Sequence, residues 1–206
     1  MSGERRWPLS EARRLAEDLR DLLADGCERI QIAGSIRREK ADVGDIELLC
    51  IPSPAVHAWD VDDLDHVVKE MMRVGRLQYR LSKVGKVAYG PFNKLLVDVP
   101  SGIGVDVFST TERNWGMALV VRTGPAEFCK ALMQRFLSIG YRGHAYGGVT
   151  NRQGVAIDCP DEATVFRLAR LSWQAPGDLD RWVSSLAADG LGSREQRNQI
   201  RGRLAP

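Results

Sequence analysis

Residues 34–47 read GSIRREKADVGDIE, a stretch that combines a Gly-Ser pair, two arginines and two carboxylates separated by one residue. Successive side chains of a strand point to opposite faces, so a strand beginning at Asp45 places Asp45 and Glu47 on one face and turns Ile46 into the core. Carboxylate oxygens are the ligands that Mg²⁺ prefers, and two such ions can hold the entering and leaving oxygens of a phosphoryl transfer. The stretch therefore predicts a metal site beside a phosphate-binding turn.

A third acid, Asp106, lies inside the apolar segment Val105, Asp106, Val107, Phe108. A carboxylate is costly to bury in such a strand without a partner, so we expect Asp106 to face the other two carboxylates around divalent cations. Three crowded acids repel one another, and bound cations relieve that repulsion. The alternative is that Asp106 pairs with an arginine such as Arg37 or Arg113.

The Gly34-Ser35 turn is suited to phosphate binding, because glycine lets ligand oxygens approach backbone N–H groups closely. Arg37 and Arg38 extend the positive field, and a guanidinium can hold phosphate oxygens through two parallel hydrogen bonds. For Arg37 a bridge to a local acid is an equally good interpretation. Arg38 is the stronger candidate for phosphate contact.

Composition limits the class of protein. The chain has 206 residues, 44% of them hydrophobic, and a net charge of +2. No apolar run approaches the roughly 20 residues of a membrane span, and no signal peptide follows the charged N-terminus. The sequence thus predicts a cytoplasmic protein, of bacterial or viral origin. The cysteines contain no CxxC pair and are expected to be buried thiols: Cys27, Cys50, Cys129 and Cys159.

Positive charge is segregated along the chain. Residues 71–97 contain no acid, and residues 113–157 contain only Glu127, although both segments carry several arginines and lysines. Such segregation suits a protein that grips a polyanionic backbone, although a locally basic solvated surface is the alternative. The candidates for contact with such a backbone are Arg80, Lys83, Lys86, Lys94, Lys130 and Arg142.

Hydrophobic periodicity and turn residues predict an α+β fold. We expect a helix capped by Ser10 and ending near Gly26, a sheet, and a second group of elements beyond Trp115. Trp115 and Trp173 are expected in the core, and His144 is either a structural histidine or a nucleic-acid contact. The expected strands lie at 29–33, 45–51, within 76–106 (including 86–90) and within 141–156; further helices are expected at 61–72, 126–140 and 161–171.

Four segments in order, GSIRR…VGDIELL, VDVF, RTGP and DEATVFRLARLSWQAP, resemble the nucleotidyltransferase core of family X DNA polymerases, the group of DNA polymerase beta. The likeness spans roughly Leu9 to Arg181. It implies a palm over residues 1–118, with a mixed sheet flanked by helices, and a small α+β C-terminal subdomain over 119–183 that closes on the nucleotide. Residues 184–206 are expected to be a basic tail.

The resemblance also implies residue roles. Asp45, Glu47 and Asp106 match the catalytic carboxylates that hold two Mg²⁺ or Mn²⁺ ions, and Asp106 matches the one nearest the primer terminus, the candidate base for the 3′-hydroxyl proton. The nucleotide-binding candidates are Gly34 from its place in the turn, Ser35, Arg38 and Gly44 as triphosphate contacts, and Thr123 and Gly124 beside the sugar.

The chain departs from the family pattern near the expected site. Glu47 stands where aspartate is usual, and Gly104 stands where a basic residue usually precedes the third carboxylate. Positions near the expected sugar and base also differ, which puts discrimination of ribose from deoxyribose and checking of the base in doubt: Val121, Arg122, Ala126 and Cys129.

The sequence therefore predicts a DNA-directed DNA polymerase that adds deoxynucleotides to a primer 3′-end, filling short gaps in repair. Its expected partners are primer-template or gapped DNA and a deoxynucleoside triphosphate, with no membrane. One alternative is a template-independent nucleotidyltransferase acting on RNA, a small molecule or a protein. A second is a nucleic-acid-binding module without catalysis.

Overall fold

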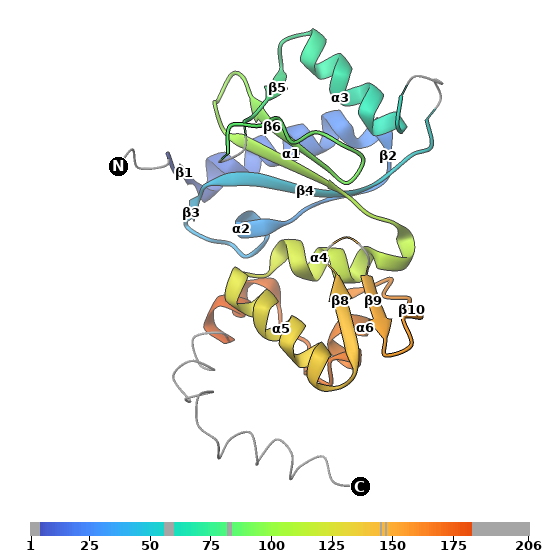
Figure 1. The fold of residues 1–206 in the computed structure, drawn as a ribbon. Helices are drawn as coiled ribbons and strands as arrows, with labels where there is room; N and C mark the ends of the chain where they lie inside the picture. Colours follow the sequence, from blue (N-terminus) through green and yellow to red (C-terminus); the bar gives the residue numbers. More distant parts are fainter. Residues whose placement is uncertain (1–4, 56–59, 82–83, 145, 147, 183–206) are drawn as a thin grey trace, which may run out of the picture.

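The structure is a computed structural model that describes residues 5–55, 60–81, 84–144, 146 and 148–182 (Figure 1). The fold is α+β, as predicted. The helices are α1 (Leu9–Leu23), α2 (Gly34–Arg37), α3 (Asp63–Arg73), α4 (Trp115–Thr123), α5 (Ala126–Ser138) and α6 (Glu162–Leu168), with short 3-10 helices η1 (Ala24–Gly26), η2 (Glu112–Asn114) and η3 (Pro176–Asp178). The strands are β1 (Trp7–Pro8), β2 (Cys27–Ile32), β3 (Asp42–Val43), β4 (Asp45–Pro52), β5 (Leu77–Tyr79), β6 (Asn93–Asp98), β7 (Gly104–Ser109), β8 (Tyr141–His144), β9 (Gly148–Asn151) and β10 (Ala156–Ile157).

The central sheet is mixed and has the strand order β2-β4-β7-β6-β5. Strands β4 and β7 run parallel, and the other neighbours are antiparallel. Figure 1 shows α1 and α3 on one side of this sheet and α4 on the other. Alternation along β4 explains both contacts: Ile46 and Leu48 join the core with α1 and α3, whereas Leu49 and Ile51 pack with α4. Asp45 and Glu47 thus share the face that α4 covers farther along the strand.

A second core lies beyond α4, where α5, α6 and the three-stranded sheet β10-β9-β8 pack together (Figure 1). Its centre contains Phe128, Phe136 and Val165. Helix α4 contributes to this core and also packs on the central sheet through Trp115 and Leu119. The predicted division between residues 118 and 119 falls inside this helix, and the predicted tail at 184–206 lies outside the described residues.

Several local predictions are wrong for identifiable reasons. Ser10 lies inside α1 and does not cap it; pairing of β1 with β3 continues to Pro8, which is the N-cap residue, so the helix begins at once. Residues 86–90 form only isolated bridges, because Gly90 and Pro91 interrupt the segment. Trp173 is exposed, since it follows α6 in an irregular connection.

The expectation that Trp115 lies in the core is confirmed, and the expected burial of the cysteines holds for two of the four. Trp115 is buried, Cys50 and Cys159 are buried free thiols, and Cys27 and Cys129 are half-buried free thiols. None of the helices in the described part of the chain has the length and apolar character needed to cross a membrane.

Candidate active site

Strand pairing brings the three predicted carboxylates together. In the parallel register of β4 and β7, Glu47 lies opposite Asp106 and Asp45 lies opposite Gly104. Neighbouring residues in register share a sheet face, so all three acids occupy the same face. Ile46 and Val105, the residues between them, are fully buried on the other face, as the alternation predicts.

Burial and the proximity of these acids raise the pKa of two of them. The pKa of Glu47 is raised to about 7, first by burial and then by repulsion from Asp45 and Asp106. The pKa of Asp106 is raised to about 6, first by burial; Arg80 opposes this shift and Asp45 adds to it. Carboxylates whose charged forms are mutually destabilised are ready to accept a cation, which would lower both pKa values.

Gly34 makes room for Glu47 at the start of α2. Its φ of +62° lies in the left-handed region that favours glycine, and a Cβ there would overlap Oε2 of Glu47 and lie 2.9 Å from Cδ. The preceding residue is tied to the same strand, because the Ala33 N–H donates to the Glu47 carbonyl at 2.8 Å. The predicted Gly-Ser turn is therefore the first part of a one-turn helix set against the carboxylates.

A cavity of about 480 Å³ opens beside the carboxylates. Four of the predicted site residues line it: Ser35, Gly44, Asp45 and Glu47. Its lining also contains four arginines: Arg5, Arg6, Arg38 and Arg80. Sequence reasoning missed the first two, which directly precede β1 and come to the cavity because Trp7 pairs with Val43.

Asp106 forms an ion pair with an arginine. The guanidinium of Arg80 donates to Oδ1 of Asp106, and both side chains are partly buried. The prediction that Asp106 shares a face with the other acids is confirmed, and it also has the arginine partner of the alternative interpretation, though not one of the two named. Arg113 instead pairs with Asp158, and Arg37 pairs with Glu162.

Arg37 connects the central sheet region to the second core. It makes two parallel hydrogen bonds to Glu162, at 2.7 and 2.6 Å, and a third to Oγ1 of Thr123 at 2.8 Å. The Arg37 and Glu162 side chains are only 16% and 18% exposed. Of the two interpretations of Arg37, the structure supports the bridge to an acid, although that acid is remote in sequence.

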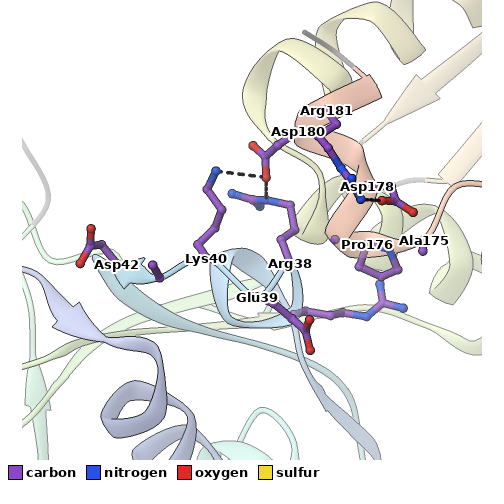
Figure 2. A pocket seen from close by; sticks show the side chains of 12 residues that line it. Arg38, Glu39, Lys40, Asp42, Ala175, Pro176, Asp178, Asp180 and Arg181 are labelled. Atoms are coloured by element: carbon purple, nitrogen blue, oxygen red, sulfur yellow. Dashed lines mark hydrogen bonds and ion pairs between the residues drawn. The ribbon is translucent and has the colours of Figure 1, made fainter. Parts of the chain in front are cut away.

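Arg38 is bound by residues of the second half of the chain. Its Nε donates to Asp180 at 3.1 Å, its Nη1 donates to the Thr123 carbonyl, and Lys40 reaches the same Asp180 at 3.4 Å. Figure 2 shows Arg38 and Lys40 converging on Asp180, at the edge of a second cavity of about 1000 Å³ between α2 and η3. Arg38 lines both cavities, so it stands between them.

Thr123 and Gly124 do not line the carboxylate cavity. Thr123 is buried. Its hydroxyl accepts a hydrogen bond from Arg37, and its carbonyl accepts one from Arg38. A Cβ on Gly124 would lie 2.5 Å from the Phe128 ring, so this glycine serves close packing against α5.

Arg122, which the resemblance puts near the expected sugar, lies close enough to the carboxylates to act on their charge. Its guanidinium stacks on the rings of Phe108, at 3.6 Å from the ring centre, and Tyr146, at 4.7 Å. The same charge lowers the pKa of Glu47 and Asp106 against the effect of burial. What the sequence did not indicate is this contact with the acids, since locally Arg122 is only a cation near the end of the apolar helix α4.

The residues predicted to contact a polyanionic backbone, expected to be DNA, differ in how exposed they are. Lys94 is 1% exposed, with its ammonium donating to the Gly90 carbonyl at 3.3 Å, so its assignment to DNA is wrong. Its position on β6 turns it inward, which residue type alone does not reveal. Lys86, Lys130 and Arg142 are exposed, as is His144 on β8, whereas Lys83 lies outside the described residues.

Among the residues that the structure describes, no group of three or more His, Cys, Asp or Glu side chains is already arranged to hold a metal ion. One oxygen of Asp106 is taken by Arg80. The donor chemistry of Asp45, Glu47 and Asp106 nevertheless fits a hard divalent cation, because all of their donors are carboxylate oxygens and their mutual repulsion calls for positive charge. The assignment of these acids as metal ligands stays a prediction.

No protein-family model matches the chain, and no curated protein matches it. Any assignment of function therefore rests on the residues and their geometry.

Proposed function

We propose that this protein is a metal-dependent DNA polymerase that adds deoxynucleotides to a primer 3′-end and fills short gaps in repair. The observation that carries the proposal is the meeting of Asp45, Glu47 and Asp106 on one face of β4 and β7, beside the Gly34-Ser35 loop. The resemblance of the quoted motifs to family X polymerases supports the same activity.

The residues suggest how the work would be divided. Asp45, Glu47 and Asp106 would hold two divalent cations, which when bound supply positive charge to the attacking oxygen, the transferred phosphate and the departing pyrophosphate. Asp106 would take the proton of the 3′-hydroxyl as that oxygen bonds to the α-phosphate. Ser35 and the arginines of the 480 Å³ cavity would orient the triphosphate and balance the charge of the pyrophosphate that leaves.

A template-independent nucleotidyltransferase is a second candidate, and one observation favours it. Cys129, at a position where the resemblance implies a longer polar contact to the base pair, turns its thiol to the carbonyls of Val121 and Gly124 at 3.3 and 3.5 Å. Arg122 is stacked between two rings. Neither side chain is directed to checking a base, so template dependence is the property to measure.

The test is single-nucleotide extension of a labelled primer on a one-nucleotide gapped duplex and on the same primer without template. Each deoxynucleotide and ribonucleotide is offered singly, with Mg²⁺ and with Mn²⁺. The polymerase assignment predicts extension with the deoxynucleotide that matches the template and little without template. Equal extension with and without template would favour the second candidate. Absence of extension in both metals would contradict both and leave a binding module.

A further inference from the structure

Arg80 reaches Asp106 from the edge of the central sheet, two strands away. It directly follows β5, its N–H donates to the Leu95 carbonyl of β6 at 3.0 Å, and its guanidinium crosses β6 to bond Asp106 on β7. The backbone anchor fixes where the side chain starts. The position of Arg80 in the ion pair is therefore set by its backbone attachment to the sheet.

Gly104 provides the space that this guanidinium fills. A Cβ at Gly104 would overlap Nη1 of Arg80 and lie 3.0 Å from its Cζ. Gly104 is not among the glycines with positive φ, so its backbone conformation does not itself require glycine. A Cβ at this position would therefore displace the end of the Arg80 side chain, which is an observation independent of the ion pair.

We propose that Arg80 is a built-in counter-ion of Asp106 that a divalent cation must displace before the carboxylate can serve as a ligand. The inference rests on the proposed function, since it concerns the same site. The guanidinium already holds Oδ1 of Asp106, and a cation that binds the same carboxylate binds at the expense of that ion pair. Arg80 is thus a positioning residue that sets the metal affinity of the site.

The test is the affinity of the full-length, metal-free protein for Mn²⁺ alone, followed by the electron paramagnetic resonance signal of free Mn²⁺. Arg80→Gln removes the competing cation. Gly104→Ala keeps every charge but pushes the guanidinium away from its place. Both variants are expected to bind Mn²⁺ roughly three- to tenfold more tightly than wild type, the range expected for a partly buried ion pair.

Two controls make the result specific. Arg113→Gln removes one positive charge from an exposed pair with Asp158 and should leave the Mn²⁺ affinity unchanged. In an Asp106→Asn background, Arg80→Gln should no longer tighten binding. This double-mutant comparison also decides the question if Gly104→Ala does not fold, which circular dichroism and thermal unfolding will show.

The outcomes separate the two levels of the proposal. Tighter binding by Arg80→Gln with unchanged binding by Gly104→Ala, when both fold, means a general charge effect and overturns the displacement. Equal affinity of wild type and both variants overturns it as well, while the proposed function stands if Asp106→Asn weakens Mn²⁺ binding. If Asp106→Asn binds Mn²⁺ as wild type does, or if no form binds it, the metal site and the proposed function fail together with this inference.

Discussion

Gly34 lies directly against the carboxylate of Glu47, and its left-handed backbone adds a second demand for glycine. Gly34→Ala is therefore expected to destabilise the fold by about 2 to 4 kcal/mol, because it combines backbone strain with displacement of Glu47. Extension activity should fall about a hundredfold, the effect of a misplaced catalytic group. Urea unfolding and single-nucleotide extension measure the two consequences.

Gly75 supplies the matched control. Its φ is +77°, but a Cβ there would meet nothing within 4 Å. Gly75→Ala isolates the backbone strain and should cost about 1 kcal/mol with activity retained. Equal losses of stability and activity in the two variants would contradict the role given to Gly34 beside Glu47.

Glu47 makes the stability of the metal-free protein depend on pH. Its pKa of about 7 in the folded state lies above the ordinary value of 4.5 that the unfolded chain shows. Between these values the folded state keeps a proton that the unfolded state releases, so stability falls as pH rises and the loss is complete above pH 7. We expect wild type to lose about 1 to 3 kcal/mol between pH 4.5 and 8 through this residue.

The measurement is urea unfolding across that pH range in the presence of a chelator. Glu47→Gln should be less sensitive to pH and more stable than wild type at pH 8. Glu17→Gln, which changes an exposed acid on α1, should follow the wild-type profile. A wild-type profile that coincides with that of Glu47→Gln would show that the carboxylate is not strained by its neighbours.

At the scale of elements, α2 is a single helical turn that depends on contacts with distant residues. Arg37 at its end bonds the first residue of α6 and the last residue of α4. Arg37→Ala leaves Glu162 partly buried without its partner, so a loss of about 2 to 3 kcal/mol is expected. Arg113→Ala, in a pair whose side chains are 65% and 58% exposed, should cost less than about 0.5 kcal/mol.

A double-mutant cycle with Glu162→Gln identifies the source of the loss. The losses in free energy of unfolding of the two single variants, each relative to wild type, should add to clearly more than the loss of the double variant. Strict additivity would mean that the two side chains do not act as a pair.

The elements with regular periodicity could be predicted well from the sequence. The expected helix at 126–140 corresponds to α5, and the expected strand at 45–51 corresponds to β4. Predictions based on a single local signal were weaker, because tertiary pairing overrides them. Because β1 pairs with β3, α1 begins before the serine that was expected to cap it. The arginines after Ser35 lie at the end of the one-turn helix α2 and are bound by residues remote in sequence.

At the scale of the whole molecule, the side chains that complete the site come from positions remote in sequence. The face shared by Asp45, Glu47 and Asp106 followed from strand alternation and from the cost of burying an acid. The partners of Arg37, Arg38 and Arg80 did not, because they lie 125, 142 and 26 residues away. Local patterns contain no information about such contacts, and net positive charge does not show which cations are already paired.

The basic surface offers a prediction at the same scale. Lys130 and Arg142 are exposed, so replacing either with Gln should lower the slope of log affinity against log salt for gapped DNA by about 0.9, the release of one counterion. Lys94→Met should leave the slope unchanged because Lys94 is buried. Fluorescence anisotropy between low and moderate salt gives the slopes. A reduced slope for Lys94→Met, or none for both exposed variants, would contradict this placement of the DNA surface.

The proposed catalytic role of the three carboxylates is tested most directly by Asp106→Asn in the gapped-duplex extension assay with Mn²⁺. The substitution keeps the size of the side chain and removes the charge that both metal binding and proton uptake need. We expect incorporation to fall by at least about a thousandfold, with an unchanged circular dichroism spectrum and unchanged binding of the gapped duplex. Extension by Asp106→Asn at a rate near that of wild type would contradict the assignment of this site.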